Sequence, residues 1–240
     1  MNKLKNFAVL GTLLALPISS FAGGADDNML GVWGSVTLQG GFTTLSPSLS
    51  KLKWQLMNQT RTRDDSPKGT RETEDLLFSQ LGYQVNTHAS IWAGYVHDWI
   101  NTPLDKPGYQ ESRPYQDFVW NQDIGSFNFM SRTRMEERIN ESNIGPQTNG
   151  YRARQLFQVS HALPFVKGLS AYVGNEVLGY VNKNTWGKQA FSEDRITSGL
   201  SYQITPQVGA DLGYLGQYVD SLTGPNLFTH NIQANLRFKF

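Results

Sequence analysis

Residues 227–240 read L-F-T-H-N-I-Q-A-N-L-R-F-K-F and alternate between apolar and polar side chains along almost their whole length. The apolar set comprises Phe228, Ile232, Ala234, Leu236, Phe238 and Phe240. The polar set comprises Thr229, Asn231, Gln233, Asn235, Arg237 and Lys239. A period of two residues places successive side chains on opposite faces of a strand. The segment therefore predicts a long β-strand with one apolar face and one polar face.

This segment resembles the closing strand of a bacterial outer-membrane barrel, in which a C-terminal Phe belongs to the signal read by the barrel-assembly machinery. The resemblance implies that Phe238 and Phe240 form an assembly signal and that this machinery is a partner. In such barrels one face of each strand contacts lipid and the other faces the lumen. We therefore predict an all-β fold, a single antiparallel transmembrane β-barrel.

The first residues of the chain have the pattern of a cleaved signal peptide. Lys3 and Lys5 precede an apolar run at residues 7–16, and Pro17 ends that run. Ser20 and Ala22 supply small residues at the positions a signal peptidase requires. About ten apolar residues are too few to span a bilayer as a helix, which argues against a membrane anchor. We expect residues 1–22 to be the signal and residues 23–240 to be one barrel in a Gram-negative outer membrane.

Composition excludes several classes of protein. Removing the two lysines of the signal changes the formal net charge from +1 to −1, which offers nothing to nucleic acid. The chain has no cysteine, so disulfides and thiolate metal sites are excluded. No later stretch approaches 18 consecutive apolar residues, so insertion into a membrane would have to use strands. We expect a monomer surrounded by outer-membrane lipids, with no cofactor and no metal.

Eleven segments separated by turn residues have strand-like patterns. They are residues 30–39, 51–61, 74–86, 90–100, 111–121, 125–138, 150–160, 169–181, 190–204, 207–219 and 227–240. Most exceed the 9–11 residues that cross a bilayer at a tilt, and few are as short as typical sandwich strands. Bacterial single-chain barrels have an even number of strands. We therefore expect ten or twelve strands, with residues 40–50 as the place of a miscount.

The predicted connections alternate in length. Residues 86–89, 121–125 and 205–207 form tight turns, whereas residues 62–73, 101–110, 140–149, 182–189 and 220–226 form longer polar loops. Short periplasmic turns and longer outer loops are typical of outer-membrane barrels. This alternation predicts that the C-terminus faces the periplasm. Aromatic residues near strand ends favour interfacial girdles: Trp33, Trp54, Trp92, Trp99, Trp120, Trp186, Tyr180, Tyr202 and Tyr218.

Charged residues gather on one face of several segments. In residues 125–138, Arg132, Arg134, Glu136 and Arg138 share a face, and an Arg facing lipid near the midplane costs about 2–4 kcal/mol. These side chains must therefore face the lumen. The predicted lumen network is Arg132, Arg134, Glu136, Arg138, Arg152, Arg154, Glu176, Glu193, Arg195 and Asp211. With Arg237 and Lys239 the tally is eight cations and four anions.

Two interpretations of this face remain open. Buried charges must be paired, so the residues can form a structural network that holds the barrel closed. Alternatively, a basic lining can form a narrow aqueous pore that favours anions. The sequence alone allows either.

Catalytic patterns are weak, and we expect no enzyme. A serine hydrolase needs Ser and His within hydrogen-bonding reach, with an orienting acid. The candidates are His88 with Ser90, Ser160 with His161, and His97-Asp98 or His230 with Ser198 or Ser201. No spacing selects among them, and no GxSxG, HExxH or phosphate-binding motif occurs. An outer-leaflet lipid-modifying hydrolase is the alternative function.

Five short segments carry a resemblance to a family. They are S-R-T-R-M-E-E-R (131–138), G-Y-R-A-R-Q-L-F (150–157), N-E-V (175–177), F-S-E-D-R-I-T-S-G-L-S-Y (191–202) and D-L-G-Y (211–214). Together they resemble the bacterial outer-membrane barrel family called domain of unknown function 2490. Family members often carry D-x-R where this chain has Glu193-Asp194-Arg195, with Asp194 adjacent to Arg195. The resemblance implies a barrel and no established activity.

Overall fold

A computed structural model describes residues 25–64, 69–101 and 107–240. The predicted signal peptide and its predicted cleavage after Ala22 lie outside the described residues. The described part of the chain forms eleven strands and one short 3-10 helix: β1 (Ala25–Gly41), η2 (Pro47–Leu49), β2 (Leu52–Asp64), β3 (Thr70–Gln84), β4 (Ala89–Ile100), β5 (Tyr109–Ile124), β6 (Phe127–Asn140), β7 (Gly150–Ala162), β8 (Leu169–Tyr180), β9 (Ala190–Gln203), β10 (Val208–Val219) and β11 (Asn226–Lys239).

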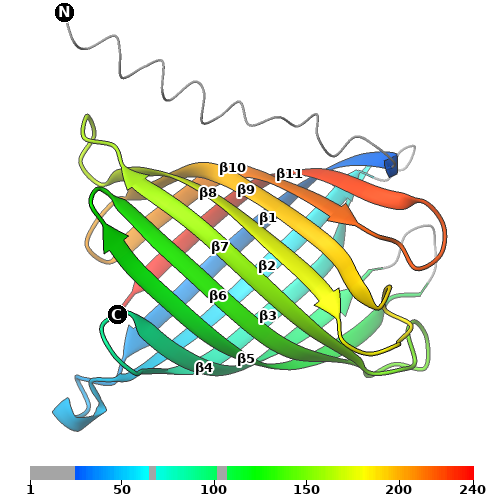
Figure 1. The fold of residues 1–240 in the computed structure, drawn as a ribbon, viewed down its shortest axis with the longest axis horizontal. Helices are drawn as coiled ribbons and strands as arrows, with labels where there is room; N and C mark the ends of the chain where they lie inside the picture. The colour runs from blue at the N-terminus through cyan, green and yellow to red at the C-terminus, as the bar shows by residue number, and fades with distance from the viewer. Residues whose placement is uncertain (1–24, 65–68, 102–106) are drawn as a thin grey trace, which may run out of the picture.

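The strands form one closed barrel in which each strand pairs with the next along the chain (Figure 1). Ten of the pairings are antiparallel, but β1 and β11 run parallel, from Ala25 beside Asn226 to Gln39 beside Lys239. An odd number of up-and-down strands forces the first and last strands to point the same way. The count of eleven segments is confirmed. The expectations of an even number and a wholly antiparallel sheet are wrong.

Residues 40–50, where a miscount was expected, hold the end of β1 and the helix η2 rather than another strand. Ser46 caps η2, since its hydroxyl oxygen accepts the amide hydrogen of Ser48 at 3.4 Å. β2 extends to Asp64 and β3 begins at Thr70, so the loop predicted over residues 62–73 is shorter than expected.

The two ends of the barrel differ in their connections. At the end that holds Lys239, named here the C-terminal end, the connections are residues 42–51, 85–88, 125–126, 163–168 and 204–207. At the opposite end, named the long-loop end, they are residues 65–69, 101–108, 141–149, 181–189 and 220–225. The tightest turn uses Gly125 at φ 62, a left-handed conformation that favours glycine. Because β1 and β11 are parallel, Ala25 lies at the long-loop end.

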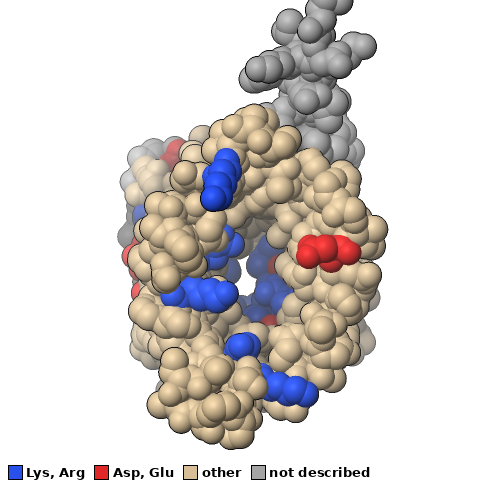
Figure 2. Space-filling model, turned by 90° about the vertical axis from the view of Figure 1, so that its left-hand side faces the viewer, with Lys and Arg blue, Asp and Glu red and all other residues tan. Residues whose placement is uncertain are grey.

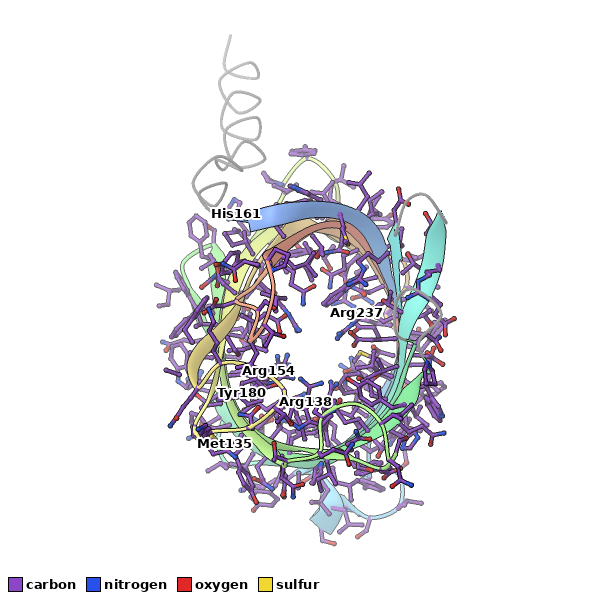
Figure 3. All side chains as sticks on the ribbon, turned by 90° about the vertical axis from the view of Figure 1, so that its right-hand side faces the viewer. Met135, Arg138, Arg154, His161, Tyr180 and Arg237 are labelled. Carbon is purple, nitrogen blue, oxygen red and sulfur yellow. The ribbon has the colours of Figure 1, made fainter. Side chains whose placement is uncertain are left out.

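Apolar side chains cover much of the outer face of the wall. Leu81, Phe157, Leu212 and Ile232 are each about 60% exposed on four different strands. Polar pairs interrupt this surface, and one example is Asn175, which donates to Asp194 at 2.7 Å. Figure 3 shows the contrast between faces, with Met135 and His161 outside and Arg138, Arg154 and Arg237 pointing into the lumen. Among the described residues, no helical segment has the length and apolar character needed to span a membrane.

The inner face is not uniformly polar. Leu76, Phe78, Val96 and Tyr115 form a buried apolar cluster on β3, β4 and β5, and Met57 of β2 packs against it. This cluster fills one side of the lumen. The charged residues described next lie mainly on the other side, on β6 to β9, and toward the long-loop end.

Candidate functional site in the barrel lumen

The register between β6 and β7 places oppositely charged residues beside each other. Glu136 pairs directly with Arg152 across the two strands, and both residues are 4% exposed. Arg152 Nε donates to Glu136 Oε1 at 2.5 Å, and Arg154 donates to the other carboxylate oxygen at 3.2 Å. Because side chains alternate between faces, R-x-E on β6 and R-x-R on β7 place all four charged residues on the inner face. Glu136 there contacts both arginines of β7.

Glu176 of β8 is the most connected carboxylate of the site. Its oxygens lie 2.6 Å from Arg132, 2.8 Å from Arg154 and 3.4 Å from Arg195. These arginines come from β6, β7 and β9, so one buried carboxylate connects four neighbouring strands. Removing a single charge from such a cluster leaves buried cations without their partner, which is costly.

The segment Glu193-Asp194-Arg195 supplies an acid-x-Arg spacing through Glu193 rather than Asp194. Glu193 and Arg195 share the inner face, and Arg195 Nε donates to Glu193 Oε1 at 2.5 Å. Gln217 of β10 donates to the same oxygen at 2.5 Å. Asp194 faces outward and accepts from Asn175. The departure from the family pattern in the sequence therefore keeps the acid and the arginine on one face.

Arg138 links this cluster to the long-loop end. It donates to both oxygens of Glu111, at 2.6 and 2.7 Å, and to the Tyr180 hydroxyl at 2.7 Å. Its guanidinium lies 4.1 Å from the ring centre of Trp186, a residue of the loop at 181–189. A loop residue therefore covers the network at this end of the lumen.

The predicted charged face began at β6, so six of the seventeen charged residues that are paired on the inner face, all on β2 to β5, were not predicted. Arg113 of β5 pairs with Glu111 and with Asp98 of β4. Arg134 forms a double hydrogen bond with Asp117, each contact 2.7 Å long. The same period-two rule would have found them, since Glu111, Arg113 and Asp117 occupy alternate positions of one strand.

A further pair on β2 and β3 is stacked on an aromatic ring. Arg61 contacts Glu74 at 2.6 Å, and its guanidinium lies 3.9 Å from the ring centre of Trp33. Arg195 of β9 approaches from the other side of the β1–β11 pairing and lies 5.1 Å from the same ring. Trp33 is 5% exposed and faces the lumen, so its assignment to an interfacial girdle is wrong. The same correction applies to Trp92, whose indole nitrogen donates to Ser90 inside the barrel.

Nearly all of these charges cancel. Ion pairs on the inner face involve nine arginines, at positions 61, 113, 132, 134, 138, 152, 154, 195 and 237, and eight carboxylates, at positions 74, 98, 111, 117, 136, 176, 193 and 211. We call this set the lumen network. All ten residues predicted for it are members. The predicted excess of four cations falls to one among the paired groups, because four carboxylates and only two arginines were missed, and because Lys239, counted in the prediction, is not among the paired residues.

Two cavities border the lumen network. The larger, about 680 Å³, is lined by Arg132, Arg154 and Arg237 among others and extends toward the C-terminal end. The smaller, about 280 Å³, lies at the long-loop end between Arg138, Arg152 and the loop residue Trp186. Figure 2 views the C-terminal end and shows a central hollow bordered by basic side chains. The lumen is therefore constricted by the network between two open spaces.

The C-terminal segment of β11 follows its predicted alternation. Arg237 faces the lumen, 3.0 Å from Asp211, and donates to Ser201 at 2.9 Å. Phe238 lies on the outer side, and Phe240 stacks on Trp54 with ring centres 6.1 Å apart. The role of Phe238 and Phe240 as an assembly signal stays a prediction.

Among the described residues, no hydrogen bond joins a predicted catalytic serine to a predicted catalytic histidine; His88 bonds the carbonyl oxygen of Asn121, and His230 bonds the Tyr214 hydroxyl. His97 faces outward and Asp98 inward, and Ser160 and His161 are likewise on opposite faces, because neighbouring strand residues alternate. Ser112, which sequence analysis did not consider, lies directly across from His97 on the outer face. However, the Ser112 hydroxyl hydrogen-bonds to Glu141 and Tyr95 rather than to His97.

Among the described residues, no group of three or more histidine or carboxylate side chains is placed to hold a metal ion. A family profile described as "Protein of unknown function (DUF2490)" matches residues 30–228. No curated protein and no solved structure matches the chain. The matched span contains every member of the lumen network except Arg237.

Proposed function

The chain belongs to the DUF2490 family, whose function is unknown, and we propose that it is an integral outer-membrane β-barrel with a narrow, ion-paired lumen. The observation that carries this proposal is the division of the wall into two faces. Large apolar side chains are exposed outside, while buried arginine–carboxylate pairs lie inside. A soluble protein rarely exposes an apolar surface of this extent.

The backbone of the closed wall is suited to a lipid environment. In hydrocarbon every backbone donor and acceptor must be satisfied internally, and a closed barrel satisfies this requirement without an open sheet edge. The strands run from 12 to 17 residues, enough to cross a bilayer when tilted. Outer-membrane lipids would then solvate Leu81, Phe157, Leu212 and Ile232.

The proposed orientation places the C-terminal end in the periplasm and the long-loop end outside the cell. It rests on the predicted signal peptide, on the C-terminal aromatic residues and on the longer loops at one end. The protein would be a monomer, exported through residues 1–22 and inserted by the barrel-assembly machinery. With an odd strand number, the start of β1 would face the outside.

Within this barrel the lumen network has two roles in the proposal. It links β2 to β3, β4 through β9, and β10 to β11 by charge pairs, and it narrows the lumen to a passage for water and small ions. The near-balance of nine arginines and eight carboxylates favours a narrow, self-paired constriction over a wide anion-selective channel.

Planar-bilayer recording of the purified mature protein tests this function. We expect small, steady conductance from the native protein and a severalfold larger conductance from Arg138→Ala. That substitution removes the side chain between Glu111, Tyr180 and Trp186, while Arg113 still neutralises Glu111. Lys183→Ala, in the same loop region but outside the network, is the matched control. Silent membranes from both native protein and Arg138→Ala would remove the pore from the proposal.

We further propose that the protein is not an enzyme. The outer-leaflet hydrolase remains the rival class, and the nearest approach to such a site is Ser112 opposite His97. Ser112 donates to Glu141 rather than to His97, so the serine–histidine hydrogen bond of a Ser-His-acid hydrolase is not formed here. Phospholipid and lipid A from cells that overproduce the protein should match those of control cells. Deacylated lipid that disappears with Ser112→Ala would favour the hydrolase.

A further inference from the structure

The charges of the lumen network are distributed unevenly along the barrel axis. Six of its nine arginines line the larger cavity, at positions 61, 132, 134, 154, 195 and 237, but only three of its eight carboxylates do, at positions 117, 176 and 211. The other three arginines and five carboxylates lie in the strand halves nearer the long-loop end. The balanced network is therefore polarised, with its positive side facing the larger cavity.

The C-terminal end continues this positive field. Lys51, Lys53, Lys167 and Lys239 lie at or beside the connections of that end, against Asp123 and the terminal carboxylate. Figure 2 shows basic side chains outnumbering acidic ones on this face. A cleft with one sign of charge raises the local concentration of the opposite ion. Anions would thus be drawn toward the larger cavity from the C-terminal end.

Two polar groups at the cavity wall retain hydrogen-bonding capacity. Within the described structure, Arg132 Nε and the Tyr172 hydroxyl are buried atoms without a hydrogen-bond partner. Arg132 contacts Glu176 through its terminal nitrogen only, and its side chain is 24% exposed. Both side chains line the cavity, so a ligand there can supply the partner that each of these atoms lacks.

Gly199 and Gly213 lie directly against the Tyr172 hydroxyl. A Cβ at Gly199 would lie 2.7 Å from the Tyr172 hydroxyl, and a Cβ at Gly213 would lie 2.6 Å from it. Neither position could hold a larger residue without displacing this hydroxyl. The wall is therefore shaped to hold the tyrosine oxygen at the cavity.

The remainder of the cavity lining is rich in uncharged hydrogen-bonding groups. Gln55, Gln80, Gln158, Gln233 and Asn235 line it, and Trp92 adds an aromatic surface. Amides pair with hydroxyl groups, guanidinium groups pair with carboxylates, and aromatic rings pack against apolar ring faces. At about 680 Å³ the cavity is within the range of small-molecule sites.

We propose that the larger cavity binds a small hydroxylated carboxylate, such as a sugar acid, which enters from the C-terminal end. The carboxylate contacts Arg132, while the Tyr172 hydroxyl and the amides, at other points of the lining, contact the hydroxyl groups. This inference deepens the proposed function and rests on it, since the ligand reaches the cavity through an open lumen.

Equilibrium dialysis of the mature, detergent-folded protein with radiolabelled glucuronate tests the site. Glucose and glucosamine serve as neutral and cationic probes of similar size. We expect saturable glucuronate binding at least about tenfold tighter than that of either sugar, because a tenfold change corresponds to only about 1.4 kcal/mol. Arg132→Gln should weaken glucuronate binding by about tenfold, and Tyr172→Phe should weaken it severalfold.

Both site variants are chosen to preserve the fold. Glu176 retains Arg154 and Arg195 when Arg132 is replaced, and Tyr172→Phe preserves the ring. Lys167→Gln, in the turn at residues 163–168, removes a charge from the same end without touching the cavity and should leave binding unchanged. Equal binding of glucose, absence of saturable glucuronate binding, or unchanged binding in both site variants would overturn the inference. Conductance measured on the same preparations tests the pore separately, since either result can fail while the other holds.

Discussion

The half of the lumen nearer the long-loop end is packed with ion pairs, whereas the half nearer the C-terminal end is open and amide-lined. In the first half Glu136, Arg152 and Glu193 are each less than 10% exposed and contact one another or shared partners. In the second half the pair of Arg237 with Asp211 has side chains 37% and 11% exposed. The same strands form both halves, so the difference lies in the inward-facing residues alone.

This contrast separates two uses of charge within one wall. Buried pairs with several partners connect strands and exclude solvent, at the cost of a large penalty when one partner is lost. A half-exposed pair remains solvated and contributes little to stability. We therefore expect the long-loop half to determine stability and the C-terminal half to determine which solutes enter.

Glu176→Gln should have the largest effect. Loss of this carboxylate leaves Arg132, Arg154 and Arg195 buried with one fewer anion, so we expect a loss of about 3–5 kcal/mol in the free energy of unfolding. Urea titration in detergent, together with the heat-modifiable band on a gel, measures this loss. Asp211→Asn is the control from the other half and should cost no more than about 1 kcal/mol. Similar losses from the two variants would erase the distinction between the halves.

Trp33→Leu should have an intermediate effect at the border of the two halves. The substitution removes the ring between Arg61 and Arg195 and leaves a smaller side chain. We expect a loss of about 2–3 kcal/mol, from cation–π attraction and reduced packing. The same urea titration applies. Trp99→Leu, on the outer face and 39% exposed, is the matched tryptophan control and should change the result little.

Gly94→Ala should have the smallest effect and tests how tightly the wall packs at the buried apolar cluster. A Cβ at Gly94 would lie 2.4 Å from the Tyr115 ring and 2.8 Å from Gln80. We expect a loss of about 1–3 kcal/mol, because overpacking forces neighbouring side chains to move. A Cβ added at Gly34 would have no atom within 4 Å, so Gly34→Ala should be neutral or slightly stabilising. A neutral Gly94→Ala would indicate that the wall at Tyr115 is looser than the contacts imply.

Much of the fold could be predicted from the sequence because strand alternation is local information. The eleven segments, the inward face of Arg132 to Arg138 and the alternation of β11 all follow from period two. The even strand number was wrong because it came from a rule about other barrels. Closure depends on how β1 meets β11, and no residue pattern within either strand specifies that the seam is parallel.

The sequence predicted which charged residues of β6 to β10 belong to the lumen network, but it did not predict which of them pair with each other. Period two places Glu176 inside, but the arrangement that surrounds it with three arginines depends on the registers of four strands. Trp33 illustrates the same limit. Its sequence position suggests an interfacial residue, whereas the curvature of the wall brings it between Arg61 and Arg195 from opposite sides of the seam.

The sequence by itself determined which side chains share a face, because adjacent residues in a strand must alternate. It thereby determined that a row of charges lies opposite a row of apolar groups. Only the tertiary structure decided how those charges combine, that they nearly balance, and that their positive side borders the larger cavity. Ion pairing depends on distances between strands far apart in the chain, and those distances are set when the barrel closes.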